Sequence, residues 1–235
     1  MARIILIGGG SSSGKSYVTR NVIKNVGADF VTRITLDDYY LDQKNVPMEE
    51  RVKVNYDHPK AFDWTLMRSQ IKDLKNDKPI RKPTYDFVNH TRSDVYEDIV
   101  PKKLVVVEGI MALTDKQLRE MADLRIFINA SAERRFLRRL IRDRKERGRT
   151  FESIVNQYFS TVQPMYDEII EPSSTYSDMI INNDGVKNLA IEVLTCLFRD
   201  ELIKANQGIN RTNPMDDEFT EETLNSVFQD AKNSK

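Results

Sequence analysis

The residues with the plainest chemical meaning form a glycine- and serine-rich stretch between an apolar run, residues 4–7, and a helical pattern that begins near Tyr17. Glycines let successive backbone N–H groups turn toward one anion, and the N-terminus of the following helix adds positive potential. Lys15 can reach the outer phosphates of a nucleoside triphosphate, and the Ser16 hydroxyl can bind Mg²⁺. The stretch therefore predicts a phosphate-binding loop (P-loop). The predicted triphosphate-binding residues are Gly9, Gly10, Ser11, Ser12, Ser13, Gly14, Lys15, Ser16 and Tyr17.

Carboxylates follow two other apolar runs. Glu108 comes directly after residues 104–107, and a carboxylate in that position beside a P-loop typically holds Mg²⁺ through water. Asp37 follows residues 31–36 and can take the proton of an acceptor hydroxyl, although it could instead only cap the next turn. Asp38 is the less suitable base, because adjacent side chains at a strand end point in opposite directions. We predict Ser16, Glu108 and Asp37 as the metal-binding residues, and Asp37, Lys15 and Arg142 as the catalytic residues.

The most basic segment of the chain, residues 131–163, is predicted to form a helical lid. Arg139 and Arg142 lie three residues apart and therefore share one face of a helix. Arginines held over a P-loop stabilise the charge on a phosphoryl group in transfer. Gly148 would form the hinge between the two helices of this lid. The residues alone also allow a solvated helix face or a groove that binds nucleic acid.

Apolar runs at regular intervals indicate the fold that positions these residues. The five runs are residues 4–7, 31–36, 104–107, 124–128 and 179–181. Short and nearly continuous apolar runs are typical of strands that are buried on both faces, so we predict an α/β fold with a five-stranded parallel sheet and helices on both faces. Ligands of such sheets bind beyond the carboxyl ends of the strands, which is where the P-loop, Asp37 and Glu108 would lie.

A long insertion, residues 38–103, separates the second and third predicted strands. Asp63 could cap a helix that places four apolar side chains on one face. Those side chains are Trp64, Met67, Ile71 and Leu74. Residues 80–96 are rich in Pro, Thr, Tyr and Val without a helical period, so we predict an irregular hairpin that closes over a substrate.

The C-terminal part is predicted to close the domain. Residues 186–204 form an amphipathic pattern whose sheet-facing side chains would be Leu189, Val193, Leu194 and Leu197. Cys196, the single cysteine, is expected to pack there as a small apolar group. We expect residues 1–206 to form one domain and residues 207–235 to form a linker and an acidic tail.

Composition narrows the class of partners. The chain has 235 residues, and its 36 Lys and Arg balance its 36 Asp and Glu, so no overall field attracts nucleic acid or an anionic membrane. One cysteine excludes an internal disulfide framework and suits a reducing compartment. No apolar run has the length of a membrane span and no signal peptide is visible, so we expect a cytoplasmic protein that binds neither a membrane nor nucleic acid.

Several motifs together resemble the uridine/cytidine kinase group of the phosphoribulokinase/uridine kinase family, in order over residues 4–181. The P-loop discriminates little, but Asp-His-Pro-x-Ala-Phe-Asp and Tyr-Asp-Phe-x-x-His-x-Arg separate the chain from phosphoribulokinase and pantothenate kinase. The motifs are the P-loop, Asp37-Asp38-Tyr39-Tyr40, Tyr56-Asp57-His58-Pro59-Lys60-Ala61-Phe62-Asp63, Tyr85-Asp86-Phe87-Val88-Asn89-His90-Thr91-Arg92, Val107-Glu108-Gly109-Ile110, Arg142-Asp143, Glu146-Arg147-Gly148-Arg149 and Gln157-Tyr158.

The resemblance implies transfer of the γ-phosphoryl group of ATP or GTP to the 5′-hydroxyl of uridine or cytidine, giving UMP or CMP in pyrimidine salvage. It implies Asp37 as the base and a magnesium-dependent reaction. The substrate-binding residues that it implies are Asp57, Tyr85, Phe87, His90, Arg139, Arg149 and Gln157. It also implies a homo-oligomer, commonly a tetramer.

Two departures and two alternatives qualify this expectation. The family's usual aspartates after the fourth strand are replaced by Asn129-Ala130-Ser131, and Asn182-Asn183-Asp184-Gly185 replaces its usual loop beside the purine pocket, which leaves the choice of ATP or GTP open. The first alternative is a kinase of the same fold that acts on another small alcohol, such as a sugar phosphate or a different riboside. The second is a P-loop module whose arginine helix binds RNA.

Overall fold

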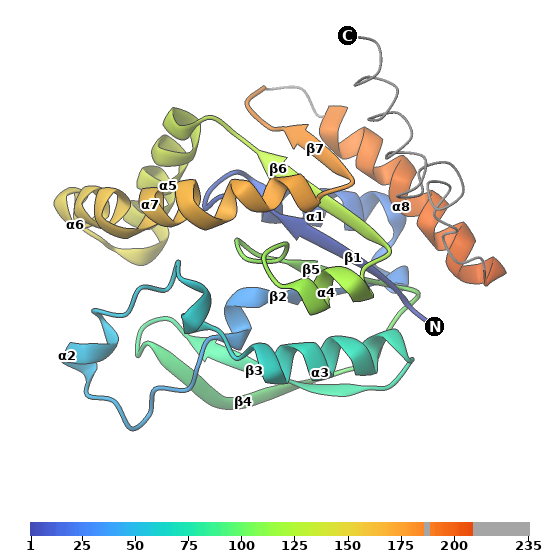
Figure 1. Ribbon diagram of the computed structural model, residues 1–235, viewed down its shortest axis with the longest axis horizontal. Coiled ribbons are helices and arrows are strands. Elements are labelled where there is room, and N and C mark those ends of the chain that lie inside the picture. The colour runs from blue at the N-terminus through green and yellow to red at the C-terminus, as the bar shows by residue number, and fades with distance from the viewer. Residues whose placement is uncertain (186–188, 209–235) are drawn as a thin grey trace, which may run out of the picture.

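The computed structural model describes residues 1–185 and 189–208 (Figure 1). Its centre is a five-stranded sheet with the strand order β2-β5-β1-β6-β7, and all neighbouring strands run parallel. The strands are β1 (Arg3–Gly8), β2 (Val31–Thr35), β5 (Leu104–Glu108), β6 (Leu124–Asn129) and β7 (Met179–Asn182). The predicted strands and the parallel sheet are therefore confirmed.

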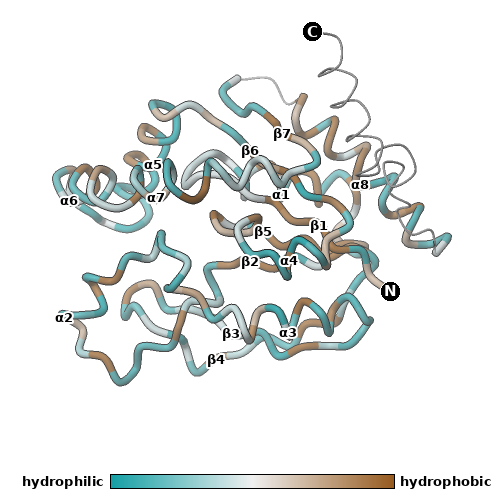
Figure 2. Tube along the Cα trace, viewed as in Figure 1, coloured by the Kyte–Doolittle hydropathy of each residue, from teal (hydrophilic) through white to brown (hydrophobic). Residues whose placement is uncertain are grey.

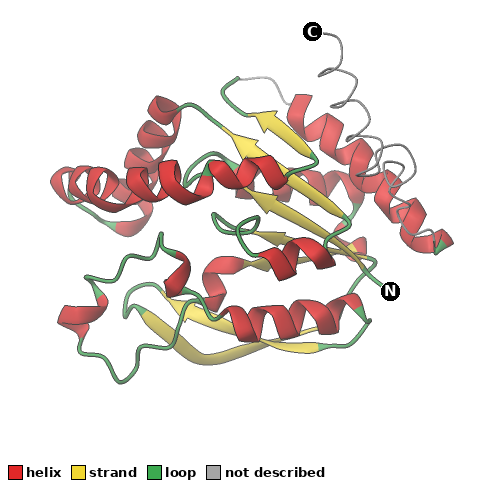
Figure 3. Cartoon of the chain, in the orientation of Figure 1, coloured by secondary structure: helices red, strands yellow, loops and turns green. Residues whose placement is uncertain are grey.

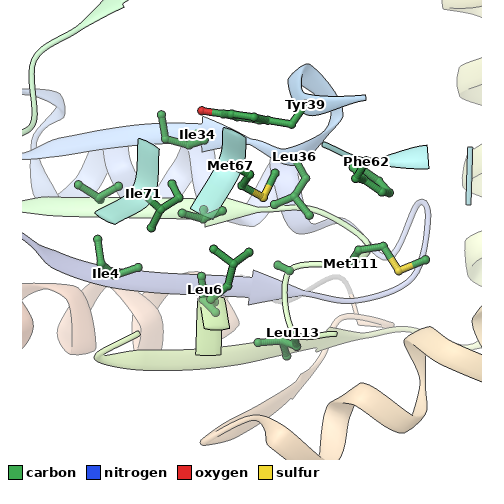
Figure 4. Packing of buried hydrophobic residues seen from close by; sticks show 14 of the residues in the cluster. Ile4, Leu6, Ile34, Leu36, Tyr39, Phe62, Met67, Ile71, Met111 and Leu113 are labelled. Atoms are coloured by element: carbon green, nitrogen blue, oxygen red, sulfur yellow. The ribbon is translucent and has the colours of Figure 1, made fainter. Parts of the chain in front are cut away.

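Apolar side chains from both faces of the sheet hold the fold together. On one face, Val18 and Val22 of α1 (Lys15–Val26) and Leu194 and Phe198 of α8 (Leu189–Gln207) pack on the strands. On the other face, Met67 and Ile71 belong to the cluster that Figure 4 shows. Helices α3 (Trp64–Lys75) and α4 (Lys116–Met121) contribute to that face, and Figure 3 shows helices on both sides of the strands. Figure 2 shows hydrophobic residues along β1 and β5, as expected for strands buried on both faces.

The insertion forms a second, two-stranded sheet beside α3 (Figure 1). Strands β3 (Ile80–Asp86) and β4 (Thr91–Ile99) pair antiparallel, with a shift of register between Pro83 and Tyr85, so the predicted irregular hairpin is confirmed. The other elements of the insertion are short. They are a 3₁₀ helix (Leu36–Tyr39), α2 (Met48–Arg51) and another 3₁₀ helix (Pro59–Ala61).

The predicted lid begins with α5 (Ala132–Arg147), which Ser131 caps by accepting a hydrogen bond from the Arg134 N–H. Gly148 ends α5 in a left-handed conformation with φ of 61°. A nearly continuous helical path follows, so the helical region extends beyond residue 163. It consists of α6 (Phe151–Gln157), a π-helix (Tyr158–Val162), α7 (Gln163–Met165), a second π-helix (Tyr166–Ile170) and a 3₁₀ helix (Pro172–Tyr176).

Helix α8 matches its predicted orientation only in part. Leu194 and Leu197 pack on the sheet-side cluster as predicted, but Leu189 is 61% exposed, Val193 is also exposed, and Cys196 is exposed instead of packed. The prediction was wrong for these three residues because α8 carries apolar residues around much of its circumference, so periodicity alone did not select the face. The side chains that α8 buries are Ile191, Leu194, Thr195, Phe198 and Glu201.

Helix α8 continues to Gln207, where the linker was expected to begin, and the predicted acidic tail lies outside the described residues. Among the helices of residues 1–185 and 189–208, none combines the length and the apolar character that crossing a membrane requires.

An ion pair joins the hairpin to α3. Arg92 of β4 lies 3.0 Å from a carboxylate oxygen of Asp63 and also donates to the Tyr40 carbonyl. Asp63 is the N-cap of α3, where its other oxygen accepts a hydrogen bond from the Leu66 N–H. One carboxylate therefore starts a helix and anchors the hairpin.

This double role can be tested by substitution. Asp63→Ala removes both contacts and should lower the free energy of unfolding in urea by about 2 kcal/mol. Asp63→Asn keeps a capping oxygen and should lose about half as much. Asp29→Ala, at an exposed aspartate, is the control. Equal losses for Asp63→Asn and Asp63→Ala would contradict a capping contribution.

Candidate active site at the carboxyl edge of the sheet

The P-loop lies between β1 and α1, as predicted, and its glycines are required by its conformation. Gly9 has φ of 137°, and a Cβ atom there would lie 2.2 Å from the Ile128 carbonyl oxygen. Gly14 has φ of 96° and precedes the first turn of α1. The Lys15 Nζ donates hydrogen bonds of 2.7 Å to the carbonyls of both Gly9 and Gly10. The lysine is therefore buried and held against the loop.

Two carboxylates and two arginines lie close enough to Lys15 for their charges to affect its pKa. Burial lowers the pKa of Lys15 from 10.5 to about 8, whereas the negative charges of Glu108 and Asp37 act to raise it. Arg142 and Arg135 add positive charge nearby. Carboxylates after β2 and β5 thus meet the P-loop lysine and the lid at one edge of the sheet, as the strand ends predicted.

Glu108 is 1% exposed and engages only one oxygen in hydrogen bonds. Its Oε1 accepts hydrogen bonds from Arg33, whereas its Oε2 is buried without a hydrogen-bond partner in the described structure. The charge of Glu108 acts on Lys15, which directly precedes Ser16 at the start of α1. An unpartnered buried carboxylate oxygen in this position fits a magnesium ion whose other ligands are the Ser16 hydroxyl, phosphate oxygens and water. The described residues contain no cluster of three or more His, Cys, Asp or Glu side chains that could hold a metal without such ligands.

Asp37 and Asp57 face the same group of cations. Burial raises the pKa of Asp37, while Lys15 and Arg147 act to lower it. Burial also raises the pKa of Asp57, and Arg139 is the strongest opposing charge. Neither side chain forms a hydrogen bond or an ion pair within the described residues. Both carboxylates are therefore available to a ligand beside the P-loop.

Asp38 points elsewhere. Its carboxylate accepts a hydrogen bond from the Lys82 Nζ on β3, and Lys82 also pairs with Glu97 at 3.2 Å. This arrangement agrees with the expectation that Asp37 and Asp38 point in different directions. Asp38 supports the hairpin.

Aromatic rings of the insertion form one group, and the charge of Asp57 acts on its member Tyr40. The Tyr85 ring lies 5.1 Å from that of Tyr40 and 5.2 Å from that of Phe87 at the exposed hairpin tip. The His90 ring stacks on Tyr56 at 5.5 Å. Tyr85, Phe87 and His90, which the sequence predicted as substrate-binding residues, are thus brought together.

The lid meets this aromatic group. The Arg147 guanidinium lies 5.9 Å from the Phe87 ring centroid. Partial burial lowers the pKa of His90, and the charge of Arg149 lowers it further. The hairpin and the lid therefore come together above the P-loop edge.

Lid side chains also contact the P-loop and each other. Arg139 donates to the Ser11 hydroxyl at 2.8 Å and to the Gln157 amide oxygen at 2.8 Å. Arg149 donates to the same Gln157 oxygen. Gln157, predicted to bind substrate, here links two lid arginines. Arg142 is bound to its neighbour Asp143, and Tyr17 is exposed on the first turn of α1.

Four contributing residues were not assigned a role from the sequence. Arg33 donates a hydrogen bond to Glu108. The charge of Arg147 acts on Asp37, and its guanidinium lies over the Phe87 ring. Arg138 and Asn183 both donate to the Ser13 carbonyl, at 3.2 Å and 2.8 Å. Arg147 lies in the Glu-Arg-Gly-Arg motif, and this position could have marked it. No local pattern marks Arg33, since its partner comes from a separate strand. Asn183 belongs to the loop that departs from the family pattern.

Comparisons with known proteins agree with this geometry. A sequence profile described as the phosphoribulokinase/uridine kinase family matches residues 4–190. A uridine kinase from Staphylococcus aureus (strain JH9) is 49% identical over 192 residues, which make up 82% of this chain and 93% of that protein.

Solved structures share the fold. Phosphoribulokinase from Rhodobacter spheroides has a TM-score of 0.66 at 14% identity, covering 87% of this chain and 99% of that chain. D-glycerate 3-kinase from Cryptococcus neoformans var. grubii has a TM-score of 0.59 at 16% identity, covering 79% and 88% of the two chains. These structural matches support the α/β P-loop kinase fold.

The burial of Lys15 predicts a pH-dependent stability. Between the folded pKa of about 8 and the ordinary value of 10.5, the unfolded state binds more protons than the folded state. The contribution of Lys15 therefore makes the free energy of unfolding of the unsubstituted protein, here called the parent, rise with pH. Lys15→Met lacks this contribution. From pH 7.5 to pH 9.5, the parent should gain about 2 kcal/mol more than Lys15→Met, measured by urea unfolding. Lys24→Met, which replaces an exposed lysine of α1, should behave like the parent. Parallel pH profiles for the parent and Lys15→Met would contradict the burial argument.

Proposed function

Because the chain belongs to the phosphoribulokinase/uridine kinase family, we propose that it is a uridine kinase that transfers the γ-phosphoryl group of ATP or GTP to the 5′-hydroxyl of uridine or cytidine. The observation that carries this proposal is the convergence of Lys15, Asp37 and Asp57 at one edge of the sheet. A triphosphate on the P-loop and a riboside alcohol beside Asp57 would meet there. The products would be UMP or CMP, as in pyrimidine salvage.

Asp37 serves as the base in this proposal. Its carboxylate accepts the proton of the 5′-hydroxyl as the oxygen bonds to the γ-phosphorus, and its raised pKa favours this uptake. The bond from the γ-phosphorus to the β,γ-bridging oxygen breaks, and the nucleoside diphosphate leaves. Lys15 and the lid arginines Arg139 and Arg142 neutralise the charge on the phosphates. Mg²⁺ held by Ser16 and Glu108, with Asp37 nearby, would supply further charge neutralisation.

Asp57 and the aromatic group provide recognition of the nucleoside. A ribose diol offers two hydroxyl donors to one buried carboxylate, which suits Asp57. Tyr85 and Phe87 would pack against the pyrimidine. His90 can present a donor or an acceptor according to its tautomer, which would tolerate both a uracil carbonyl and a cytosine amino group. Arg149 and Gln157 would approach the nucleoside from the lid.

The alternative functions are less well supported. Two of the lid arginines, Arg139 and Arg142, are turned inward to Ser11, Gln157 and Asp143, so they do not form a continuous basic surface for RNA. An identity of 49% to a uridine kinase also disfavours a kinase of unrelated alcohols. We further propose that the enzyme is a cytoplasmic homo-oligomer whose substrates are small molecules and not nucleic acid.

Removal of the proposed base tests the mechanism. Asp37→Asn should lower kcat by about 10²-fold to 10⁴-fold, because the hydroxyl proton loses its acceptor, while ATP binding remains close to that of the parent. Turnover is measured with labelled ATP and a panel of nucleosides and sugars, and ATP binding by calorimetry. Asp38→Asn is the matched control and should affect stability more than turnover, because Asp38 binds Lys82. A fully active Asp37→Asn enzyme would reject the assignment.

Recognition of the ribose has its own test. The parent should use uridine about 100-fold better than 2′-deoxyuridine in kcat/KM, because the deoxy substrate leaves a buried carboxylate partly unpaired. In Asp57→Asn this preference should shrink to about 10-fold or less, mainly through a higher KM for uridine. Asp98→Asn, at an exposed aspartate of β4, is the matched control and should keep the preference. An undiminished preference in Asp57→Asn would place ribose recognition elsewhere.

A further inference from the structure

A fully buried carboxylate in the lid has no role in the proposed reaction so far. Asp143 of α5 is 0% exposed, yet its side chain lies among four guanidinium groups. The nearest distances are 2.8 Å to Arg142, 3.6 Å to Arg139, 3.7 Å to Arg147 and 3.7 Å to Arg149. A single buried negative charge is thus the common neighbour of these arginines.

Local geometry explains why these cations converge. Arg139 and Arg147 lie four residues before and after Asp143, so they share its face of α5. After Gly148 takes its left-handed conformation, the Gly148 N–H and the Arg149 N–H both donate to the Asp143 carbonyl. This turn brings Arg149 back toward the carboxylate. The carbonyl of Asp143 therefore ends the helix, and its carboxylate gathers the arginines.

The contacts differ in kind. The Asp143 Oδ1 accepts a hydrogen bond of 2.8 Å from the Arg142 Nε, whereas Oδ2 is buried without a hydrogen-bond partner in the described part of the chain. The three longer ion pairs, at 3.6–3.7 Å, therefore act through charge. They leave the terminal nitrogens of Arg139 free to donate to Ser11 of the P-loop and to Gln157.

We propose that Asp143 is a positioning residue, the internal counter-ion that keeps the lid arginines aligned over the P-loop for phosphoryl transfer. This inference rests on the proposed kinase function, and Asp143 itself touches no substrate. Like charges at this spacing repel each other, so the arginines hold one arrangement only while a negative charge lies among them. The charge of Asp143 provides that arrangement before the triphosphate arrives.

The proposal predicts different effects on kcat and on the affinity for ATP. Asp143→Asn keeps the shape of the side chain and removes its charge, so the arginines spread apart in the free enzyme. A triphosphate can replace the missing negative charge when it binds, so affinity for ATP should be kept or increased. Alignment in the transition state is lost, however, so kcat should fall. A partly unfolded preparation would also lower kcat, but it would lower the calorimetric stoichiometry of ATP binding in proportion, so kcat is expressed per ATP-binding site.

The experiment compares the parent with Asp143→Asn, Asp143→Glu and Glu146→Gln, the last a control at an exposed acid of the same helix. We measure kcat with uridine and the Kd for ATP by calorimetry. Asp143→Asn should lower kcat about 30-fold with a Kd no more than threefold weaker, since a misplaced arginine in phosphoryl transfer is costly. Asp143→Glu, which retains the charge, should recover most of kcat. Glu146→Gln should match the parent.

Three results would overturn the proposal. These are a kcat for Asp143→Asn within threefold of the parent, equal losses of kcat and ATP affinity, or a loss in Asp143→Glu as large as in Asp143→Asn. If Asp143→Asn does not fold, the same comparison is made in an Arg147→Gln background, which removes one repelling cation, against Arg147→Gln alone. An inactive parent would reject the kinase function and this inference together, whereas an active parent with an unaffected Asp143→Asn rejects only the inference.

Discussion

A concentration of buried positive charge at the carboxyl edge of one sheet governs the arrangement of this protein. Lys15 is buried and is held by the carbonyls of Gly9 and Gly10, which bind its protons but carry no net negative charge. Burying an uncompensated charge is costly, so carboxylates from separate segments are needed near it. Glu108 and Asp37 supply that charge at Lys15. The same electrostatic demand makes the edge a suitable receptor for a polyanion.

The insertion and the lid complete this edge through a small number of polar contacts. Asp63 ties the hairpin to α3 through Arg92, and Tyr85 of the hairpin packs on Tyr40, which the charge of Asp57 reaches. On the opposite side, Arg138 and Asn183 converge on the Ser13 carbonyl, which joins the lid and the loop after β7 to the P-loop. The site is therefore composite, and each segment that contributes to it is positioned by a contact with another segment.

Local patterns predicted the elements better than their orientation. The strands followed from short apolar runs, and the start of α3 followed from Asp63, because both signals depend only on neighbouring residues. The face of α8 followed only in part, because Leu189 and Val193 are exposed although they are as apolar as the residues that face the sheet. For the site, the positions after strand ends correctly brought Lys15, Asp37 and Glu108 together. The choice of a nucleoside among possible acceptors required the longer motifs of the insertion and the relatives that share them.

The sequence by itself determined the P-loop, the parallel sheet and the carboxylates that meet at its edge, because glycine conformation, strand burial and strand polarity are local or periodic properties. Only the tertiary structure decided how the long polar side chains pair. Glu108 binds Arg33 of another strand, Gln157 links Arg139 and Arg149, and Asn183 contacts the P-loop. An arginine or amide side chain has several donors or acceptors and many rotamers, so its partner is selected by which distant segments the packed core brings within reach.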